Sequence, residues 1–291
     1  MRKSYTKNGD SQNRTAQRSE RAANRPPWRI NAATLLGALI VGVIVACALG
    51  APWLATHDPL AQNLPLRLRP PMLLDARSEF VLGSDALGRD VWSRLLFGAR
   101  TSLLIAFSAT LLATSIGVSM GLLAGFRGGR LDALLSRWAD VQQAIPYLAL
   151  AIAVVAVLGS SARNLILLLG LTTWLSFFRV VRAQTLTLRA SDFVLAARAI
   201  GAADARIMAR HILPNLLGSV VVLITLLATN IVVFEASLGF LGLGVPPPQP
   251  SWGGLIADGR EYIADAWWLS TVPGALLALL ALGLNLLGDR Q

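Results

Sequence analysis

Residues 192–214 read DFVLAARAIGAADARIMARHILP, a basic segment that lies between two long apolar stretches of the chain. Its many alanines favour short helices. Gly201 can adopt the left-handed conformation that ends a helix, so it can turn the chain from one short helix into another. Asp204 would then lie in the first turn of the second helix, where negative charge is favoured, and Pro214 suits the first turn of the helix that follows. The segment therefore predicts two short helices within a longer loop, residues 183–215.

The side chains of this loop favour contact with a partner. Its small residues would let a partner's backbone approach closely, whereas a purely solvated loop needs no such face. Arg198, Arg206 and Arg210 are spaced by eight and four positions, which would place them on one helical face. A solvated basic loop is the alternative, and charge by itself does not exclude it.

Six apolar runs surround the loop. The chain of 291 residues is 54% hydrophobic and only 14% charged, whereas a soluble domain usually carries about 25% charged residues. A membrane-spanning helix needs about 20 mainly apolar residues. The runs cover residues 32–53, 101–125, 138–158, 164–181, 216–240 and 266–288. The sequence predicts an all-α membrane protein whose transmembrane domain, residues 31–291, contains six transmembrane helices.

The charged residues orient these spans. A polar, arginine-rich tail, residues 1–30, is expected to be disordered. The basic segments are this tail, 126–137 and 179–211, and the neutral or acidic segments are 54–97, 159–163 and 241–265. Cytoplasmic loops carry an excess of arginine and lysine. Six spans with both termini in the cytoplasm satisfy every segment. The net charge of +10 is therefore taken to mark the cytoplasmic loops of a protein in membrane lipid, and no nucleic-acid partner is expected.

Polar residues inside apolar runs are candidates for function. Glu235 lies near the outer end of the fifth run, where it could face a translocation path, pair with an arginine or cap a neighbouring helix; pairing is preferred. Gln142 and Gln143 lie near the inner mouth of the third run. Asn230 suits an interhelical hydrogen bond as well as it suits the path.

Residues 82–95 read LGSDALGRDVWSRL and follow the first long outer segment. The acids and arginines of this stretch suit an ordered, salt-bridged cap at the outer surface. Such a cap could receive an external protein, with Asp85, Arg89 and Asp90 as the docking residues, or it could seal the helix ends. Sealing is the preferred role for most of these residues.

Signatures of enzymes and metal centres are absent from the sequence. No Gly-x-x-x-x-Gly-Lys-Ser/Thr phosphate-binding loop occurs, so the chain is not expected to hydrolyse ATP itself. His57 and His211 are the two histidines, and the topology places them on opposite sides of the membrane. Cys47 is the single cysteine. We therefore expect neither a metal site nor a catalytic triad.

The loop also resembles a known family. Ala196 and Ala197, followed by Gly201 and then by Ile-Leu-Pro at 212–214, resemble the EAA loop of permease subunits in bacterial ABC importers. Leu195 stands where that pattern has glutamate, and His211 where it has isoleucine. Segments elsewhere resemble the oligopeptide, dipeptide and nickel branch: LGSDALGRDVWSRL at 82–95, EASLGFLGLG at 235–244 with PSWG at 250–253, and NLLGD at 285–289. The resemblance covers about residues 32–289.

The resemblance implies a C-type permease subunit of an ABC importer in the bacterial inner membrane. The expected cargo is a peptide, with nickel or a metal chelate as the alternative. The implied partners are a second permease, two cytoplasmic ATPase subunits that bind ATP and Mg²⁺, and a periplasmic or lipid-anchored solute-binding protein; no cofactor is expected on this chain. In the family the EAA segment forms two short helices that dock on the ATPase. The implied coupling residues are Ala196, Ala197, Arg198, Gly201, Ala203, Asp204, Arg206, Arg210 and Pro214.

Two other classes of membrane protein are the alternatives. A proton-coupled secondary transporter should show inverted repeats or a buried relay of carboxylates, whereas Glu235 is the one intramembrane acid of consequence. A membrane-embedded enzyme should bring His, Asp or Ser groups together at one depth, and the sequence predicts no such group. The sequence leaves the substrate open.

Overall fold

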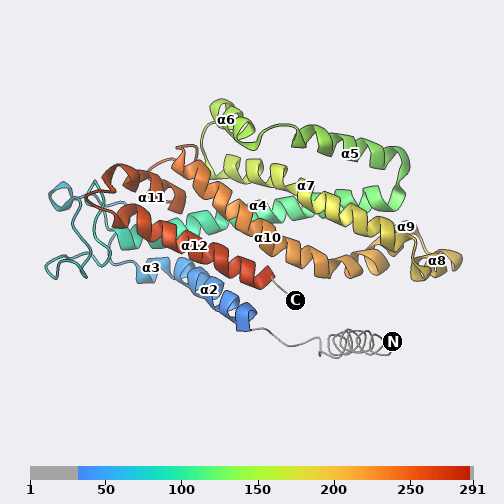
Figure 1. The fold of residues 1–291 in the computed structure, drawn as a ribbon, viewed down its shortest axis with the longest axis horizontal. Helices are drawn as coiled ribbons and strands as arrows, with labels where there is room; N and C mark the ends of the chain where they lie inside the picture. The colour runs from blue at the N-terminus through green and yellow to red at the C-terminus, as the bar shows by residue number, and fades with distance from the viewer. Residues whose placement is uncertain (1–31, 289–291) are drawn as a thin grey trace, which may run out of the picture.

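The computed structural model describes residues 32–288, which form an elongated bundle of helices without a β-strand in that range (Figure 1). The expectations for residues 1–30 and for the last three residues lie outside the described range. The helices are α2 (Ala32–Leu49), α3 (Ala51–Leu54), η1 (Leu64–Leu66), α4 (Val91–Arg127), α5 (Gly129–Gln143), α6 (Tyr147–Leu158), α7 (Ala162–Arg189), α8 (Asp192–Ala199), α9 (Asp204–Ile207), η2 (Met208–Ile212), α10 (Leu213–Phe240), α11 (Trp252–Gly259), η3 (Arg260–Tyr262) and α12 (Trp268–Gly288).

The long helices run back and forth between two ends of the bundle (Figure 1). One end, here called the cap end, contains residues 55–90 and α11. The opposite end, here called the α8 end, contains α8, α9 and η2. α2 and α10 run toward the cap end, while α4, α7 and α12 run away from it. This alternation is the up-and-down topology that the apolar runs predict.

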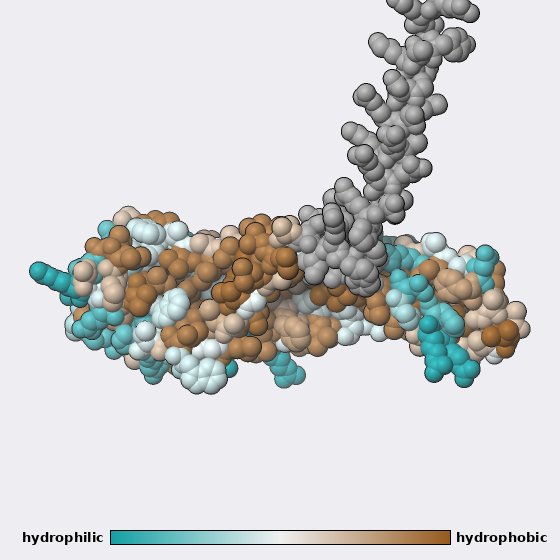
Figure 2. Space-filling model, turned by 90° about the horizontal axis from the view of Figure 1, so that it is seen from below, coloured by the Kyte–Doolittle hydropathy of each residue, from teal (hydrophilic) through white to brown (hydrophobic). Residues whose placement is uncertain are grey.

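Apolar surface occupies the middle of the molecule and hydrophilic residues gather toward its two ends (Figure 2). Five helical stretches are long and apolar enough to cross a membrane: α2, α4, α7, residues 204–240 and α12. A sixth candidate consists of α5 and α6 together, which are bent by 85° at the break between them. The predicted span 138–158 corresponds to parts of both helices and is broken between them, because Pro146 lacks the N–H that a continuous helix would need.

Several helices also extend beyond the apolar runs. α4 starts ten residues before the predicted span, because the Asp90 carboxylate accepts hydrogen bonds from the backbone N–H groups of Trp92 and Ser93 and so caps the helix at Val91. α7 continues to Arg189, so the first residues of the predicted loop 183–215 are helical. At about 1.5 Å per residue, α4 is about 55 Å long, well beyond the ~30 Å apolar core of a bilayer.

α4 and α7 pack closely along most of their length, with glycines at their contact. Gly117, Gly121 and Gly125 lie four residues apart on α4. A Cβ atom at Gly121 would lie 2.8 Å from the Phe178 carbonyl oxygen and 3.0 Å from Val181 Cβ. Small residues at this spacing let two helix backbones approach. The two helices therefore form a rigid pair that connects the cap end to the α8 end.

Candidate functional site

The two-helix element predicted from residues 192–214 forms at the α8 end. Gly201 has φ +77°, as predicted, and ends α8. Its N–H donates to the Arg198 carbonyl at 2.9 Å, and the Ala202 N–H donates to the Ala197 carbonyl at 3.0 Å. This pair of bonds is typical of a glycine C-cap. Asp204 then opens α9, so its predicted place in a first helical turn is confirmed.

α9 passes through η2 into α10, and residues 204–240 form one helical stretch. Pro214 lies in the first turn of α10, as predicted. η2 is a single π-type turn in which the Leu213 N–H donates to the Met208 carbonyl, five residues back. This wider turn accommodates a proline that has no N–H to donate. A displacement of α9 would therefore act directly on the long helix α10.

A small core fastens α8 and α9 to the rest of the bundle. Val194 and Ile207 are fully buried, one from each short helix, and they belong to one apolar cluster with Phe126 at the end of α4 and Val181 of α7. Ala197, which was expected to face a partner, is also buried in this cluster. The core could not be located from the loop sequence, because its other half comes from α4 and α7.

Large apolar side chains are exposed along α8 and just after it. Ile200 is 86% exposed and Leu195 is 51% exposed, and Phe193 is also exposed. Ile200 follows the last helical residue of α8, and the three residues lie at the end of the molecule away from the apolar band. Large apolar side chains exposed outside a membrane indicate a contact with another protein. Leu195, the departure from the EAA pattern, is one of the three.

The three arginines of the loop do not share one helical face. Arg198 lies on α8, Arg206 on α9 and Arg210 in η2, and the turn at Gly201 separates the first from the other two. The Arg198 guanidinium lies over the Phe126 ring, 5.1 Å from its centroid. The predicted common face is therefore wrong, since it assumed one continuous helix. The other expected coupling residues on the surface are Ala196, Ala203, Asp204, Arg206, Arg210 and Pro214.

Ion pairs fasten α5 to α7 near the α8 end. Arg182 forms a two-pronged contact with Asp132, with Arg182 Nη2 2.7 Å from Asp132 Oδ2. Arg179 pairs with Asp140 at 3.0 Å. Arg179 and Arg182 both belong to the basic segment 179–211. In the structure, each of them forms an ion pair that holds α5 against α7.

The four polar residues predicted for the path or for helix pairing lie in different environments. The Gln142 amide donates to the Leu171 carbonyl and accepts from the Trp174 indole N–H at 3.0 Å, so it pairs α5 with α7. Gln143 and Asn230 are exposed. A cavity of about 1030 Å³ lies among α2, α4, α10 and α12, and its lining residues include none of the four.

Glu235 is fully buried near the Ser102 side chain, but neither of its carboxylate oxygens has a hydrogen-bond partner with good geometry among the described residues. The predicted pairing with an arginine is therefore absent within residues 32–288. Burying an unpaired carboxylate costs free energy. Such a group in a membrane helix is a candidate for function.

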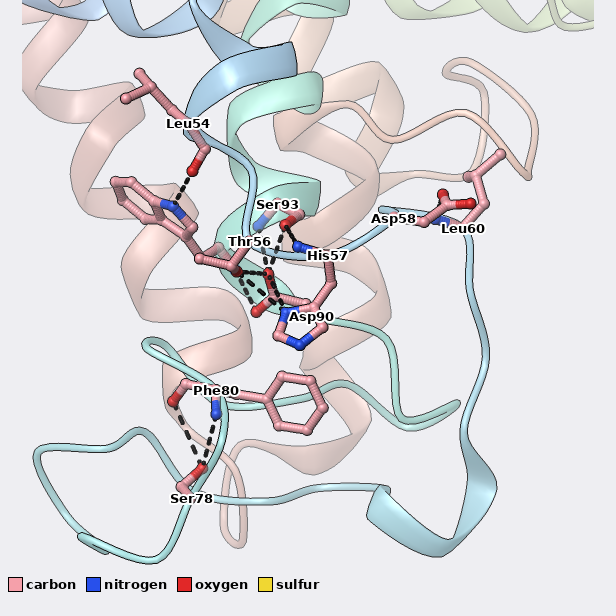
Figure 3. Close-up of polar contacts among 10 residues, drawn as sticks. Leu54, Thr56, His57, Asp58, Leu60, Ser78, Phe80, Asp90 and Ser93 are labelled. Carbon is pink, nitrogen blue, oxygen red and sulfur yellow. Dashed lines mark hydrogen bonds and ion pairs between the residues drawn. The ribbon is translucent and has the colours of Figure 1, made fainter.

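Asp90 is the centre of one group of buried contacts at the cap end (Figure 3). Its carboxylate accepts hydrogen bonds from the Thr56 hydroxyl at 2.8 Å and from the Ser93 hydroxyl at 2.5 Å. The backbone N–H of His57 donates to the Ser93 hydroxyl at 3.1 Å. These bonds join the segment after α3 to the first turn of α4.

Asp85 and Arg89 belong to a second group. Arg89 Nε lies 2.7 Å from Asp85 Oδ2, and Arg94 Nη2 lies 3.2 Å from Asp258 Oδ2. Partial burial raises the pKa of the Asp258 carboxyl above its ordinary value, while Arg94 and Arg89 oppose that rise. Asp258, on α11, also belongs to this group. Its pairing with Arg94 could not be predicted from the sequence, because no local pattern links residues so far apart in the chain.

The burial of three cap residues argues against the predicted role of the cap in docking an external protein. The residues proposed as external docking sites, Asp85, Arg89 and Asp90, are each no more than 9% exposed. They have little surface to present to another protein. Their contacts correspond to the sealing role, in which the cap binds α4 and α11 together.

Two family models match different parts of this chain. Residues 117–291 match the family described as "binding-protein-dependent transport system inner membrane component". Residues 28–71 match the "N-terminal TM domain of oligopeptide transport permease C".

Several curated proteins are similar over most of their length. A di/tripeptide transport system permease protein DppC of Pseudomonas aeruginosa is 42% identical over 89% of this chain and 86% of its own. A probable D,D-dipeptide transport system permease protein DdpC of Escherichia coli is 38% identical, over 88% and 84%. An oligopeptide transport system permease protein OppC of Bacillus subtilis is 35% identical, over 90% and 84%.

A solved structure shares the fold. A chain of the MetNI methionine ABC transporter in an inward-facing conformation aligns with a TM-score of 0.56 and 21% identity, over 68% of this chain and 94% of that one. At this identity the likeness concerns the arrangement of helices alone.

Proposed function

The chain belongs to the family of binding-protein-dependent transport system inner membrane components, and we propose that it is a membrane-spanning permease subunit of an ATP-binding cassette importer for peptides. The similarity to permeases named for dipeptides, tripeptides and oligopeptides supports this substrate class. Those names give no support to the alternative, nickel or metal-chelate import.

We assign the α8 end to the cytoplasm and the cap end to the outside. Arginines of the loops at the α8 end, such as Arg127, Arg130, Arg206 and Arg210, support this orientation under the positive-inside rule. α2 begins and α12 ends on the side facing the α8 end (Figure 1). Both termini of the chain are then cytoplasmic, in a multi-pass protein of the inner membrane.

The observation that carries the proposal is the exposure of three large apolar residues, Phe193, Leu195 and Ile200, on and just after a short helix outside the apolar band. A short helix that exposes apolar side chains on more than one side is suited to a groove on a cytoplasmic ATPase subunit. An apolar Leu195 in place of glutamate makes the contact depend on buried apolar area rather than on a salt bridge. ATP binding and hydrolysis belong to two such partner subunits, and a second permease completes the path.

The mechanism follows from how α8 and α9 are attached. Closure of the ATPase pair on ATP would displace α8 and α9 together, because Val194 and Ile207 share one buried core. That core includes the end of α4 and part of α7, and α9 continues into α10. The displacement therefore reaches three membrane helices at once, and their tilt would switch the path between inward-open and outward-open states.

A crosslinking experiment tests the docking role. In a background where Cys47 is replaced by alanine, Ala203→Cys lies at the exposed turn between α8 and α9. We expect a thiol-reactive crosslinker to join it to a cysteine in the partner groove of the ATPase subunit in the assembled transporter. The yield should change when ATP is added, since the ATPase pair then closes.

Ala133→Cys provides a matched control, because Ala133 is exposed on α5 but lies outside the two-helix element. It should crosslink weakly and without dependence on ATP. If Ala203→Cys gave no more crosslinking than Ala133→Cys in a fully assembled complex, the docking role would be rejected.

A further inference from the structure

A closed loop in the cap, residues 71–80, presents an apolar segment to solvent; this segment, residues 72–74, is here called the tip. The Met72 N–H donates to the Phe80 carbonyl at 3.0 Å and closes the loop. The Leu74 and Asp75 N–H groups both donate to the Pro71 carbonyl, at 2.8 and 3.1 Å. Because backbone hydrogen bonds close the loop, its conformation does not depend on the side chains of the tip.

The tip consists of three consecutive large apolar residues, Met72, Leu73 and Leu74, whose exposed fractions are 47%, 93% and 60%. Pro71 and Phe80, at the base, are buried instead. An ordered loop that buries Pro71 and Phe80 but presents three consecutive large apolar side chains to solvent has the features of a contact surface. The tip is distinct from the buried ion pairs of the cap.

The position of the loop limits what can cover it. Residues 55–90 project beyond the ends of the long helices (Figure 1), outside the apolar middle of the molecule. Figure 3 draws Ser78 and Phe80, at the base of the loop, away from the first turn of α4 that carries Ser93. Lipid chains and a helix embedded beside the bundle would both lie next to the apolar middle. A soluble partner on the outer side fits this position.

Exposed arginines surround the tip in the sequence. Arg67, Arg69 and Arg77 are exposed, against Glu79 and a half-buried Asp75. The Asp75 carboxylate is also engaged with the loop itself, because it accepts from the Arg77 backbone N–H at 3.0 Å. The three arginines against two acids leave a small positive balance beside the tip in the sequence, which would complement an acidic surface.

We propose that the Met72–Leu74 tip is the contact by which this permease receives the external solute-binding protein, in an apolar socket with an acidic rim. This inference rests on the proposed function, since it needs a binding-protein-dependent importer. The docking role then belongs to this exposed loop and not to the buried residues Asp85, Arg89 and Asp90. The neighbouring arginines speed and orient the encounter, and the apolar tip stabilises the complex.

The test uses the complete transporter in lipid nanodiscs and the purified solute-binding protein of the same system. Leu73→Ser combined with Leu74→Ser removes the apolar tip while leaving the closing backbone bonds in place. We expect the dissociation constant for the binding protein to rise about tenfold or more, as expected when two apolar side chains no longer become buried. Arg77→Glu should slow association and reduce its dependence on salt.

Leu60→Ser is the matched control, because Leu60 is also an exposed leucine of the cap and lies on its other side from Ser78 (Figure 3). It should change the dissociation constant by less than about twofold. If the double serine variant also bound as wild type does, the proposal would be overturned. It would also be overturned if that variant lost the second permease during purification, since the tip would then be a contact between permeases.

A label at the tip distinguishes a protein partner from lipid. A nitroxide on Leu73→Cys, in the Cys47→Ala background, should be accessible to a water-soluble relaxation agent and become protected when the binding protein is added. A label accessible only to a lipid-soluble agent would assign the tip to the membrane and contradict the proposal. If the wild-type assembly bound no binding protein at all, the proposed function itself would fail, which is a different result from an unaffected tip variant.

Discussion

Glu235 is the residue whose surroundings agree least with its chemistry. It lies on α10, is fully buried, and has no hydrogen-bond partner for either carboxylate oxygen among the described residues. An unsatisfied buried polar group costs about 1–3 kcal/mol. A neighbour on the same helix shows the usual solution: the Thr229 hydroxyl donates to the Thr225 carbonyl at 3.0 Å. We infer that Glu235 is kept for transport rather than for stability.

Glu235→Leu separates these two roles. We expect the purified assembly to unfold at the same temperature as wild type or higher, with a gain of up to about 3 kcal/mol, because an unsatisfied group is removed. Transport should fall at least tenfold. Differential scanning fluorimetry and uptake into proteoliposomes measure the two effects, with Thr229→Val as the control that should leave transport nearly intact. A clear loss of stability in Glu235→Leu would show that the carboxylate has a stabilising partner.

Single residues were predictable where the backbone alone decides their role. Gly201 was predicted as a helix end because glycine adopts positive φ without strain, and Pro214 because it lacks an N–H. The positions of Arg198 and Ala197 were not predictable, because Phe126 and the rest of their contacts come from helices distant in the sequence. For the same reason the burial of the cap residues Asp85, Arg89 and Asp90 could not be read from the sequence.

At the scale of elements, the contact between α4 and α7 determines how the two ends of the molecule communicate. Gly117, Gly121 and Gly125 recur every four residues, a spacing that suits close helix packing but does not say which helix packs there. The structure identifies the opposing helix as α7. At the break between α5 and α6, the sequence shows the proline at position 146 but does not determine the 85° bend.

Gly121→Ala tests the α4–α7 contact. The added methyl group would lie 2.8 Å from the Phe178 carbonyl oxygen, and such overpacking typically costs about 1–3 kcal/mol. We expect the melting temperature of the detergent-solubilised assembly to drop by several degrees. Gly42→Ala, at a helical glycine of α2 with no neighbouring atom within 4 Å, should not lower it. Equal behaviour of the two variants would show that α4 and α7 are not held by close glycine packing.

At the scale of the whole molecule, the alternation of apolar runs and charged loops predicted the helix order and the two-ended organisation. It did not predict how far α4, α7 and α10 extend beyond the apolar band, because polar residues at helix ends resemble loop residues in composition. It also did not predict the contact between Arg94 and Asp258, which joins two segments 164 residues apart. Long-range pairs of this kind leave no periodic signal in one sequence.

We propose that this chain moves peptides only when ATPase partners drive it. This is tested by the uptake of a radiolabelled dipeptide into proteoliposomes that contain both permeases and both ATPase subunits, with the solute-binding protein added outside and ATP enclosed inside. We expect uptake that requires ATP and the binding protein and that is lost when the ATPase subunits are omitted. Uptake by the permeases without ATPase subunits, driven by a proton gradient, would show that the proposal is wrong.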